Sequence, residues 1–333
     1  MRIGIAGVGR IGSFHAKTLR QHPEVQSLVV TDADGARARQ VAKKLEADVV
    51  ERPEDLLSAR IDALVIATAT DSHAAWILRG VEAGVPVFCE KPVALDAGQT
   101  REVVRRVEGS GVQVHIGFQR RFDVGYMAAR KAIREGTLGW VHTLRATTLD
   151  AAPPPAAYIP TSGGIFRDCS VHDFDVLRWV TGREVVSVYA VGQNRGEEFF
   201  RAAGDVDTMG ALLTLDDGAI AMVSCSRYNA RGYDVRLEVL GSKDSLAVGL
   251  DARLPLRSVE PGVTFPDGTP YPMFLDRFRD AYVRELEAFV DVVAGRSASP
   301  CTVRDALASL YVAEACEVSR RENRPVRLEE VTR

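Results

Sequence analysis

The sequence predicts an α/β protein with two domains: a doubly wound parallel sheet, and then a second α/β domain with a large, mainly antiparallel open sheet. Over residues 1–120, apolar strand patterns alternate with helical patterns, which is typical of a parallel sheet. Over residues 185–250, strand patterns follow one another directly, as in antiparallel sheets. The length of 333 residues exceeds one typical core, so we expect domains at 1–120 and 121–333.

Composition argues against several classes of protein. The formal net charge is -3 without a basic block, so we expect no nucleic-acid partner. The five cysteines are widely spaced and form no CxxC pair, which predicts neither a disulfide framework nor a thiolate metal site. The N-terminus enters an apolar strand within two residues, and no apolar run reaches membrane-spanning length. We therefore expect a cytoplasmic protein without a signal peptide, a membrane partner or a metal.

A glycine motif follows the first predicted strand, Arg2–Ala6. Gly7, Gly9 and Gly12 form G-x-G-x-x-G, and a helical pattern runs from Ile11 to about Gln21. The first glycine permits the tight turn, the second lets a pyrophosphate approach the backbone, and the third lets helix and strand pack closely. The helix N-terminus offers free N–H groups to the phosphates. The motif therefore predicts a dinucleotide site in a Rossmann domain, formed by Gly7, Gly9, Arg10, Ile11 and Gly12.

An acidic residue follows the second predicted strand, Val25–Val30. Asp32 lies 20 residues after Gly12, about where the acid that binds the ribose belongs. A carboxylate there accepts bonds from the ribose hydroxyls and repels a 2′-phosphate. This favours NAD over NADP as the cofactor, although Arg37 and Arg39 lie close enough in sequence to keep NADP open.

Hydroxyl groups and a histidine follow the buried strand Asp62–Ala67. Thr68, Thr70 and His73 are candidate cofactor ligands, because ligands bind outside the carboxyl ends of such strands. The alternative is that Thr70 or Ser72 only caps the next helix.

The tripeptide Glu90-Lys91-Pro92 follows the apolar strand Val85–Cys89. Lys91 therefore lies at the carboxyl end of a parallel strand, and Pro92 biases it towards an extended conformation. A lysine held in this way can point into a cleft, and Glu90 beside it is a further candidate cofactor ligand. The alternative is an ordinary charged turn.

A histidine flanked by acids begins the main helix of the second domain. Asp168 and His172 are spaced i, i+4, so we expect them on one helix face, with Asp175 one turn further on. The helical pattern closes at Thr181-Gly182. A nearby carboxylate favours the imidazolium form, which makes His172 a candidate proton acceptor. The alternative is a surface salt bridge.

Polar residues also lie near the ends of the later strands. Arg227, Tyr228 and Tyr233 either reach a polar ligand or have structural roles. Two amphipathic helices, Phe274 to Ala294 and Val303 to Arg321, are expected to finish the chain.

These residues suit the oxidation of a secondary alcohol. Hydride leaves the carbon for the nicotinamide while the hydroxyl proton goes to a base, and His172 is the best base by residue type. Asp168 would orient the imidazole, and Lys91 would hold the oxygen or also relay the proton. Arg120 and Asp150 are candidate hydroxyl binders, which suits a polyol. The predicted substrate ligands are Lys91, Arg120, Asp150, Asp168, His172, Asp175 and Tyr233.

Several motifs together resemble the Gfo/Idh/MocA oxidoreductase family, specifically its inositol 2-dehydrogenase-like branch. The resemblance covers essentially the whole chain. The motifs that carry it are the glycine motif at 7–12, Thr68-Ala69-Thr70 with His73, Glu90-Lys91-Pro92, Gln119-Arg120-Arg121-Phe122-Asp123, Ser162-Gly163-Gly164-Ile165-Phe166-Arg167-Asp168, His172-Asp173-Phe174-Asp175, and Arg277-Phe278 with Ala281-Tyr282.

The resemblance implies Lys91, Asp168 and His172 as catalytic residues, NAD(P) as cofactor, and a dimer or tetramer joined through the C-terminal sheet. It implies an NAD-dependent dehydrogenase of a cyclic polyol such as myo-inositol. The alternatives are an enzyme of another sugar, sugar acid or polyol, and a non-catalytic NAD-binding sensor. Two departures from the family pattern stand out: Leu149-Asp150-Ala151 replaces Arg-Asp-Pro, and Ala69 replaces a proline. The first weakens the assignment of inositol as substrate.

Overall fold

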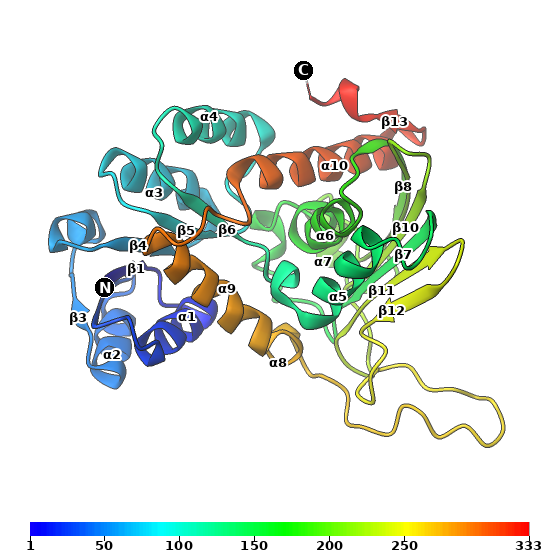
Figure 1. The fold of residues 1–333 in the computed structure, drawn as a ribbon, viewed down its shortest axis with the longest axis horizontal. Coiled ribbons are helices and arrows are strands. Elements are labelled where there is room, and N and C mark those ends of the chain that lie inside the picture. Colours follow the sequence, from blue (N-terminus) through cyan, green and yellow to red (C-terminus); the bar gives the residue numbers. More distant parts are fainter. Residues whose placement is uncertain (333) are drawn as a thin grey trace. The chain divides into compact units, whose positions relative to one another are not determined.

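The computed structural model describes residues 1–332, which form two compact units (Figure 1). The first unit comprises Met1–Gln119 and Asp280–Leu307. The second comprises Arg120–Arg279 and residues 308–332. Residues 280–307 therefore belong to the first unit. The predicted division at residue 120 had assigned them to the second domain.

The first unit is built on a six-stranded parallel sheet with the order β3-β2-β1-β4-β5-β6. Its strands are β1 (Arg2–Ala6), β2 (Ser27–Thr31), β3 (Asp48–Val49), β4 (Ala63–Ile66), β5 (Val87–Glu90) and β6 (Val114–Gly117). β4 is buried along its whole length, because a doubly wound sheet is covered on both faces. This confirms the predicted doubly wound parallel sheet.

Helices cover both faces of this sheet (Figure 1). They are α1 (Arg10–Gln21), α2 (Gly35–Leu45), α3 (Thr70–Glu82), α4 (Ala97–Glu108) and α9 (Arg279–Val293). Side chains of α1, α2 and α9 share one apolar core with β1, β2 and β4. Asp34 and Asp96 cap α2 and α4 by accepting bonds from backbone N–H groups, which satisfies donors at the helix N-termini. The short elements α2 and β3 were not predicted.

The second unit contains a seven-stranded sheet with the order β12-β11-β7-β10-β9-β8-β13. Its strands are β7 (Val141–Leu149), β8 (Val185–Gln193), β9 (Thr208–Leu215), β10 (Ile220–Ser226), β11 (Asp234–Gly241), β12 (Ser245–Val248) and β13 (Val326–Arg327). β10 runs parallel to β7, and the other neighbours are antiparallel. The predicted, mainly antiparallel open sheet is therefore confirmed.

Helices lie on one side of the second sheet (Figure 1). They are α5 (Val124–Arg134), α6 (Val171–Thr181), α7 (Glu198–Ala202), α8 (Phe274–Arg277) and the part of α10 (Val303–Glu322) from residue 308 onward. α10 is tied to β8, because the Ser319 hydroxyl accepts a bond from the Ala190 N–H at 2.9 Å. Short 3-10 turns occupy Pro53–Ala59, Gln119–Phe122, Ile159–Thr161 and Leu328–Glu330.

The helix expected from Phe274 to Ala294 is interrupted at Phe278. Phe278 leaves the helical conformation, with φ -113° and ψ 16°, and its side chain is 1% exposed. Burial of the Phe278 ring thus stabilises the chain more than a continuous helix would. The break separates α8 in the second unit from α9, which lies almost wholly in the first.

The other face of the second sheet is open (Figure 1). Large apolar side chains on β8, β9 and β10 are exposed there, among them Val191, Leu212 and Ile220. Their neighbours along each strand are buried, as the period of two in a strand requires. Within residues 1–332, no helix combines the length and the apolar character needed to cross a membrane.

Candidate active site

The glycine turn after β1 has the shape that the motif predicts. Gly7 has φ 86°, and a Cβ there would lie 2.6 Å from the Ala67 carbonyl oxygen. A Cβ at Gly12 would lie 2.0 Å from the Gly7 carbonyl oxygen, whereas a Cβ at Gly9 would meet no atom within 4 Å. Gly7 and Gly12 are therefore needed for the turn and the close packing of α1. Gly9 alone faces open space, where a pyrophosphate can approach the backbone.

Asp32 is positioned against this turn at the end of β2. Its Oδ2 accepts a bond from the Val8 N–H at 2.8 Å, and its Oδ1 accepts one from the Asp34 N–H at 2.9 Å. The Arg37 guanidinium lies 3.4 Å from Oδ1. Each carboxylate oxygen has two lone pairs, so Asp32 retains acceptor capacity for a ribose while its orientation is held by backbone donors.

The loop after β4 differs from the expected helix cap. The N-cap of α3 is Ala69, and no side chain caps the helix, so the prediction that Thr70 or Ser72 caps it was wrong. Thr70 is instead the first helical residue. The Ser72 hydroxyl lies 2.6 Å from the Thr68 hydroxyl and donates to the Ala69 carbonyl oxygen at 2.9 Å. Because its hydroxyl makes these short-range bonds, Ser72 does not accept a bond from a backbone N–H at the start of α3.

His73 links the loops that follow β4 and β5. Its ring nitrogens lie 2.7 Å from the Pro92 carbonyl oxygen and 3.1 Å from the Thr68 carbonyl oxygen. Burial lowers the pKa of His73 below its usual value. A neutral ring has one N–H donor and can bond only one of these two carbonyl oxygens, and this bond supports a positioning role for His73 within the predicted cofactor site.

Lys91 directly follows β5 and is half-buried. The peptide bond between Lys91 and Pro92 is cis. The preceding Glu90 lies with one carboxylate oxygen 2.7 Å from the His15 Nε2 on α1. β1, β2, β4 and β5 are parallel, so the glycine turn, Asp32, Thr68 and Lys91 all lie at the carboxyl edge of one sheet. In such sheets this edge is where ligands bind.

In the second unit, Asp168 and His172 lie in different helical segments. Phe166–Ser170 is a π-helical turn, and α6 starts only at Val171. Asp168 therefore lies in the π-helical turn and His172 in α6, and their shared helix face stays a prediction. Such turns are frequent at functional sites. The end of α6 at Thr181-Gly182 is confirmed.

The Asp168 carboxylate is held from two sides. The Tyr158 hydroxyl donates to its Oδ1 at 2.9 Å, and the Arg227 Nη2 donates to its Oδ2 at 2.8 Å. Arg227 is 2% exposed, and its Nη1 lies 3.2 Å from Asp150 Oδ2. The structure therefore brings together Asp150 and Asp168, two predicted site residues, through one arginine.

A second buried polar cluster in the second unit surrounds Arg120. Its Nη1 pairs with the Asp173 carboxylate, and its Nη2 donates to the Thr148 hydroxyl at 2.9 Å. Burial raises the pKa of Tyr126 to about 12 and that of Tyr233 still further above its usual range. Tyr126 Oη has no hydrogen-bond partner among the described residues. The predicted ligands Arg120 and Tyr233 are therefore buried polar groups in a shared environment.

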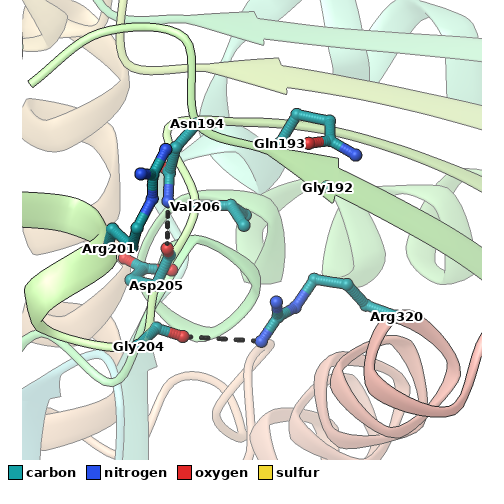
Figure 2. Close-up of a pocket in the computed structure, with 8 residues that line it drawn as sticks. All are labelled: Gly192, Gln193, Asn194, Arg201, Gly204, Asp205, Val206 and Arg320. Carbon is teal, nitrogen blue, oxygen red and sulfur yellow. Dashed lines mark hydrogen bonds between the residues drawn. The ribbon is translucent and has the colours of Figure 1, made fainter. Parts of the chain in front are cut away.

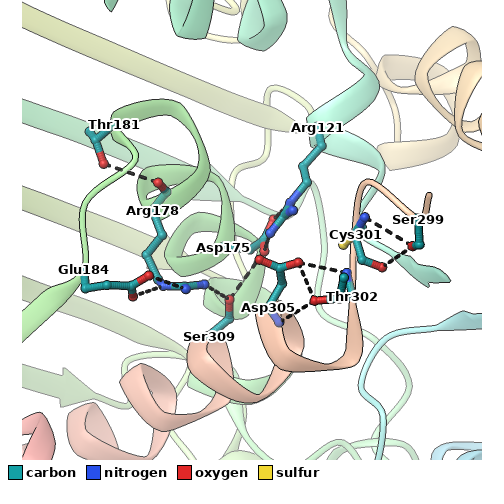
Figure 3. A network of polar contacts seen from close by, with 10 residues as sticks. All are labelled: Arg121, Asp175, Arg178, Thr181, Glu184, Ser299, Cys301, Thr302, Asp305 and Ser309. Atoms are coloured by element: carbon teal, nitrogen blue, oxygen red, sulfur yellow. Dashed lines mark hydrogen bonds and ion pairs between the residues drawn. The ribbon is translucent and has the colours of Figure 1, made fainter. Parts of the chain in front are cut away.

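Asp175 faces Arg121 (Figure 3). Arg121 Nε donates to Asp175 Oδ2 at 2.8 Å and Arg121 Nη2 to Oδ1 at 2.6 Å, and the Ser309 hydroxyl lies 3.4 Å from Oδ1. Because Asp175 is 1% exposed and both of its oxygens are bonded, the geometry supports a structural role for this predicted substrate ligand.

A cavity of about 330 Å³ opens elsewhere in the second unit (Figure 2). Gln193, Asn194, Arg201, Asp205 and Arg320 line it. None of the predicted site residues lines it. Asp205 accepts a bond from the Ile165 N–H at 3.0 Å, so this region supports the start of the π-helical turn that carries Asp168.

Two family models match the chain. Residues 1–118 match the oxidoreductase family with an NAD-binding Rossmann fold. Residues 126–247 match the GFO/IDH/MocA C-terminal domain. The chain belongs to the Gfo/Idh/MocA oxidoreductase family. This confirms the resemblance inferred from the sequence motifs, and the protein is an NAD-binding oxidoreductase of that family.

Named relatives and solved structures of the Gfo/Idh/MocA family are similar over the full length. The chain is 38% identical to the inositol 2-dehydrogenase of Rhizobium meliloti, covering 98% of each chain. It resembles the structure of a probable dehydrogenase from Thermotoga maritima, with TM-score 0.92 and 34% identity over 99% of this chain and 100% of that one. It also resembles scyllo-inositol dehydrogenase from Lactobacillus casei with bound NAD(H) and scyllo-inositol, with TM-score 0.86 and 30% identity over 99% of each chain.

Sequence reasoning missed Tyr158 and left Arg227 undecided between a ligand and a structural residue. Tyr158 lies in the loop after the prolines, where no periodic pattern marks a contact. Arg227 meets Asp150 because β10 and β7 end side by side, with Ser226 opposite Leu149. That pairing joins residues 77 positions apart, so no local signal reveals it.

Proposed function

We propose that this Gfo/Idh/MocA protein is an NAD-dependent dehydrogenase that oxidises a secondary alcohol of a cyclic polyol of the inositol type. The observation that carries the proposal is its full-length likeness to a solved scyllo-inositol dehydrogenase that holds NAD(H) and scyllo-inositol. The inositol dehydrogenases among its relatives are similar over nearly the whole chain.

The residues of the first unit fit a bound NAD. Gly9 leaves room for a pyrophosphate, the N-terminus of α1 offers free N–H groups, and Asp32 retains acceptor capacity for the ribose. The other proposed contacts are Gly7, Arg10, Ile11, Gly12, Thr68, Thr70, His73, Glu90 and Lys91. When bound, NAD supplies the acceptor for the hydride that leaves the carbinol carbon.

His172 is proposed as the general base that removes the hydroxyl proton as the carbonyl forms, and as the general acid in the reverse direction. Asp168 would orient the imidazole and stabilise its protonated form. Lys91 would donate a charge-assisted hydrogen bond to the reacting oxygen. Protons and electrons then balance: the alcohol loses a hydride to NAD and a proton to His172.

Asp150, Arg120 and Tyr233 are proposed to bind the other hydroxyls of the ring. Burial raises the pKa of the Asp150 carboxyl above its usual value, and Arg227 counteracts this rise. The Asp150 carboxyl can accept hydrogen bonds from hydroxyl groups. Asp175 belongs to the same proposed set, with its buried ion pair as the argument for an indirect role.

The proposal is tested with a panel of inositol isomers and aldoses, each with NAD and with NADP, followed at the NADH absorbance. We expect turnover with at least one inositol isomer, and faster turnover with NAD than with NADP. Turnover with aldoses alone would refute the assignment to inositols. Turnover with no polyol, together with NAD binding by fluorescence, would indicate a sensor instead.

A dehydrogenase of another sugar, sugar acid or polyol is the second candidate. Leu149 and Ala151 favour it, because they flank the proposed hydroxyl acceptor Asp150 and depart from the Arg-Asp-Pro pattern of the resemblance. An apolar Leu149 in place of an arginine removes a donor to ring hydroxyls. The same panel, extended with sugar acids, separates the two candidates, since an aldose or a sugar acid would then exceed the inositols in kcat/KM.

We also propose a homotetramer or dimer joined through the open face of the second sheet. The support is the exposed apolar set Tyr189, Val191, Leu212, Ile220 and Met222 on adjacent strands, because contiguous exposed apolar patches mark interfaces. Light scattering after gel filtration should give an oligomer for the wild type and a smaller species for Leu212→Glu. Val259→Glu, in the exposed 251–273 connection, is the matched control.

A further inference from the structure

Arg227 is a buried cation that contacts two carboxylates at once. Its Nη2 lies 2.8 Å from Asp168 Oδ2, its Nη1 lies 3.2 Å from Asp150 Oδ2, and the same Nη1 lies 2.7 Å from Cys169 Sγ. The side chain of Arg227 is 3% exposed, whereas those of Asp150 and Asp168 are 24% and 13% exposed. The carboxylates therefore have a solvent-facing side, and the arginine lies behind them.

The second sheet places Arg227 through its backbone. Arg227 and Asp150 are the first residues after the parallel strands β10 and β7, and the Asp150 N–H donates to the Ser226 carbonyl oxygen at 2.9 Å. The Arg227 N–H donates to the Asp207 carbonyl oxygen at 2.8 Å. These bonds fix the backbone from which the Arg227 side chain extends. Its guanidinium presents donors in a rigid fork, so its position sets the spacing of the two carboxylates.

Tyr158 completes the restraint on Asp168 from the opposite oxygen, with its hydroxyl 2.9 Å from Oδ1. Both oxygens of Asp168 are thus bonded, and rotation of the carboxylate would break a charge-assisted bond. A carboxylate oxygen has two lone pairs and can accept more than one hydrogen bond. A carboxylate fixed in this manner can orient an imidazole or a hydroxyl in one defined direction.

We propose that Arg227 is a positioning residue of the active site, which with Tyr158 fixes Asp168 and Asp150 in their ionised, productive orientation. This inference rests on the proposed function, since Asp168 and Asp150 act there on the imidazole and the substrate. Arg227 acts through these carboxylates and does not take part in the proton transfer. A purely structural ion pair would instead affect folding and leave the kinetics of folded enzyme unchanged.

The first readout is kinetic. Arg227→Met should lower kcat roughly 100-fold or more, since hydrogen bonds to charged groups are lost on both carboxylates. Arg227→Lys should recover part of the loss, because it keeps the charge but not the fork. Tyr158→Phe, at an exposed side chain, should lower kcat about tenfold. Unchanged kcat in folded Arg227→Met and Tyr158→Phe would overturn the proposal.

A matched control is Arg178→Met. Arg178 is also a buried arginine of this unit, 8% exposed and paired with Glu184 at 2.6 Å. We expect this change to lower the melting temperature with kcat within about twofold of wild type. A fall in kcat equal to that of Arg227→Met would show that any buried ion pair has this effect, and it would overturn the positioning role.

The second readout is independent of activity. Burial raises the pKa of the half-buried Asp150 carboxyl and Arg227 opposes this rise, so without Arg227 the pKa of Asp150 should rise further and protonation should favour the folded state. The melting-temperature gap between wild type and Arg227→Met should therefore narrow as pH falls from 8 to 5. The charged or titratable groups that face Arg227 and its two carboxylates include Cys169, Asp205, Tyr158 and Tyr233, and His172 joins them in the proposed mechanism.

The two readouts separate the inference from the proposed function. A wild-type protein that oxidises no polyol with NAD refutes the function, whatever the melting curves show. A temperature gap that is constant from pH 8 to 5 refutes the claim that Arg227 keeps these carboxylates ionised, even in an active enzyme.

Discussion

His15 on α1 and Glu90 at the end of β5 form a buried contact, with Nε2 and Oε1 2.7 Å apart. The His15 side chain is fully buried and that of Glu90 is 12% exposed. The contact ties the helix that follows the glycine turn to the residue before Lys91. One hydrogen bond thus restrains the glycine turn before α1 relative to the loop that begins with Lys91.

Breaking this contact should destabilise the first unit. A double-mutant cycle of His15→Ala and Glu90→Ala should give a coupling energy of about 1–3 kcal/mol, because a buried polar group loses its partner. Urea unfolding measures it. The exposed pair Glu102–Arg105 on α4 is the control, with about 0.5 kcal/mol or less expected. Equal coupling in the two pairs would contradict the anchoring role of His15 and Glu90.

The glycine turn allows two matched changes with opposite outcomes. Gly12→Ala places a methyl 2.0 Å from the Gly7 carbonyl oxygen, so we expect a loss of about 1–3 kcal/mol in stability without NAD. Gly9→Ala meets no atom within 4 Å, so stability should stay within about 1 kcal/mol of wild type. Its methyl occupies the space proposed for the pyrophosphate, and the Kd for NAD should rise at least ~10-fold. Fluorescence titration that shows wild-type affinity in Gly9→Ala would exclude this approach path.

Cofactor choice should depend on Asp32 and Arg37 together. Asp32→Ala removes the ribose acceptor and releases Arg37, which lies 3.4 Å from Oδ1. We expect the ratio of kcat/KM for NAD over NADP to fall about tenfold or more. Adding Arg37→Ala should reduce the gain with NADP, since the guanidinium beside position 32 is then removed. An unchanged ratio in Asp32→Ala would show that another residue discriminates the two cofactors.

His172 is the predicted general base. His172→Ala should lower kcat by roughly 10²–10⁴-fold, the usual contribution of general acid–base catalysis, with the Kd for NAD within a few-fold of wild type. His142→Ala, at an exposed histidine of the same unit, should leave both unchanged. Steady-state kinetics measures kcat and NAD titration measures Kd for both variants. Near-wild-type turnover in His172→Ala would assign the proton transfer elsewhere.

Local signals in the sequence predicted much of the fold. The bounds of β1 agree with the predicted strand Arg2–Ala6, because the apolar pattern and the glycine after it lie close together in sequence. The three glycines, Asp32 and Lys91 were also found from their position after strands, and the parallel sheet brings them to one edge. The Ala69 cap and the π-helical turn before α6 were missed, since competing local bonds decide both.

By itself, the sequence determined that this protein is a Gfo/Idh/MocA oxidoreductase with a Rossmann unit, and it named Asp150, Asp168 and His172 as chemistry-bearing residues. Only the tertiary structure decided that α9 packs in the first unit's core and that Arg227 joins Asp150 to Asp168. The reason is physical. Periodicity and turn chemistry act over a few neighbouring residues, whereas the pairing of β10 with β7 depends on burial summed over the whole sheet. A buried arginine between two carboxylates becomes visible only once that pairing exists.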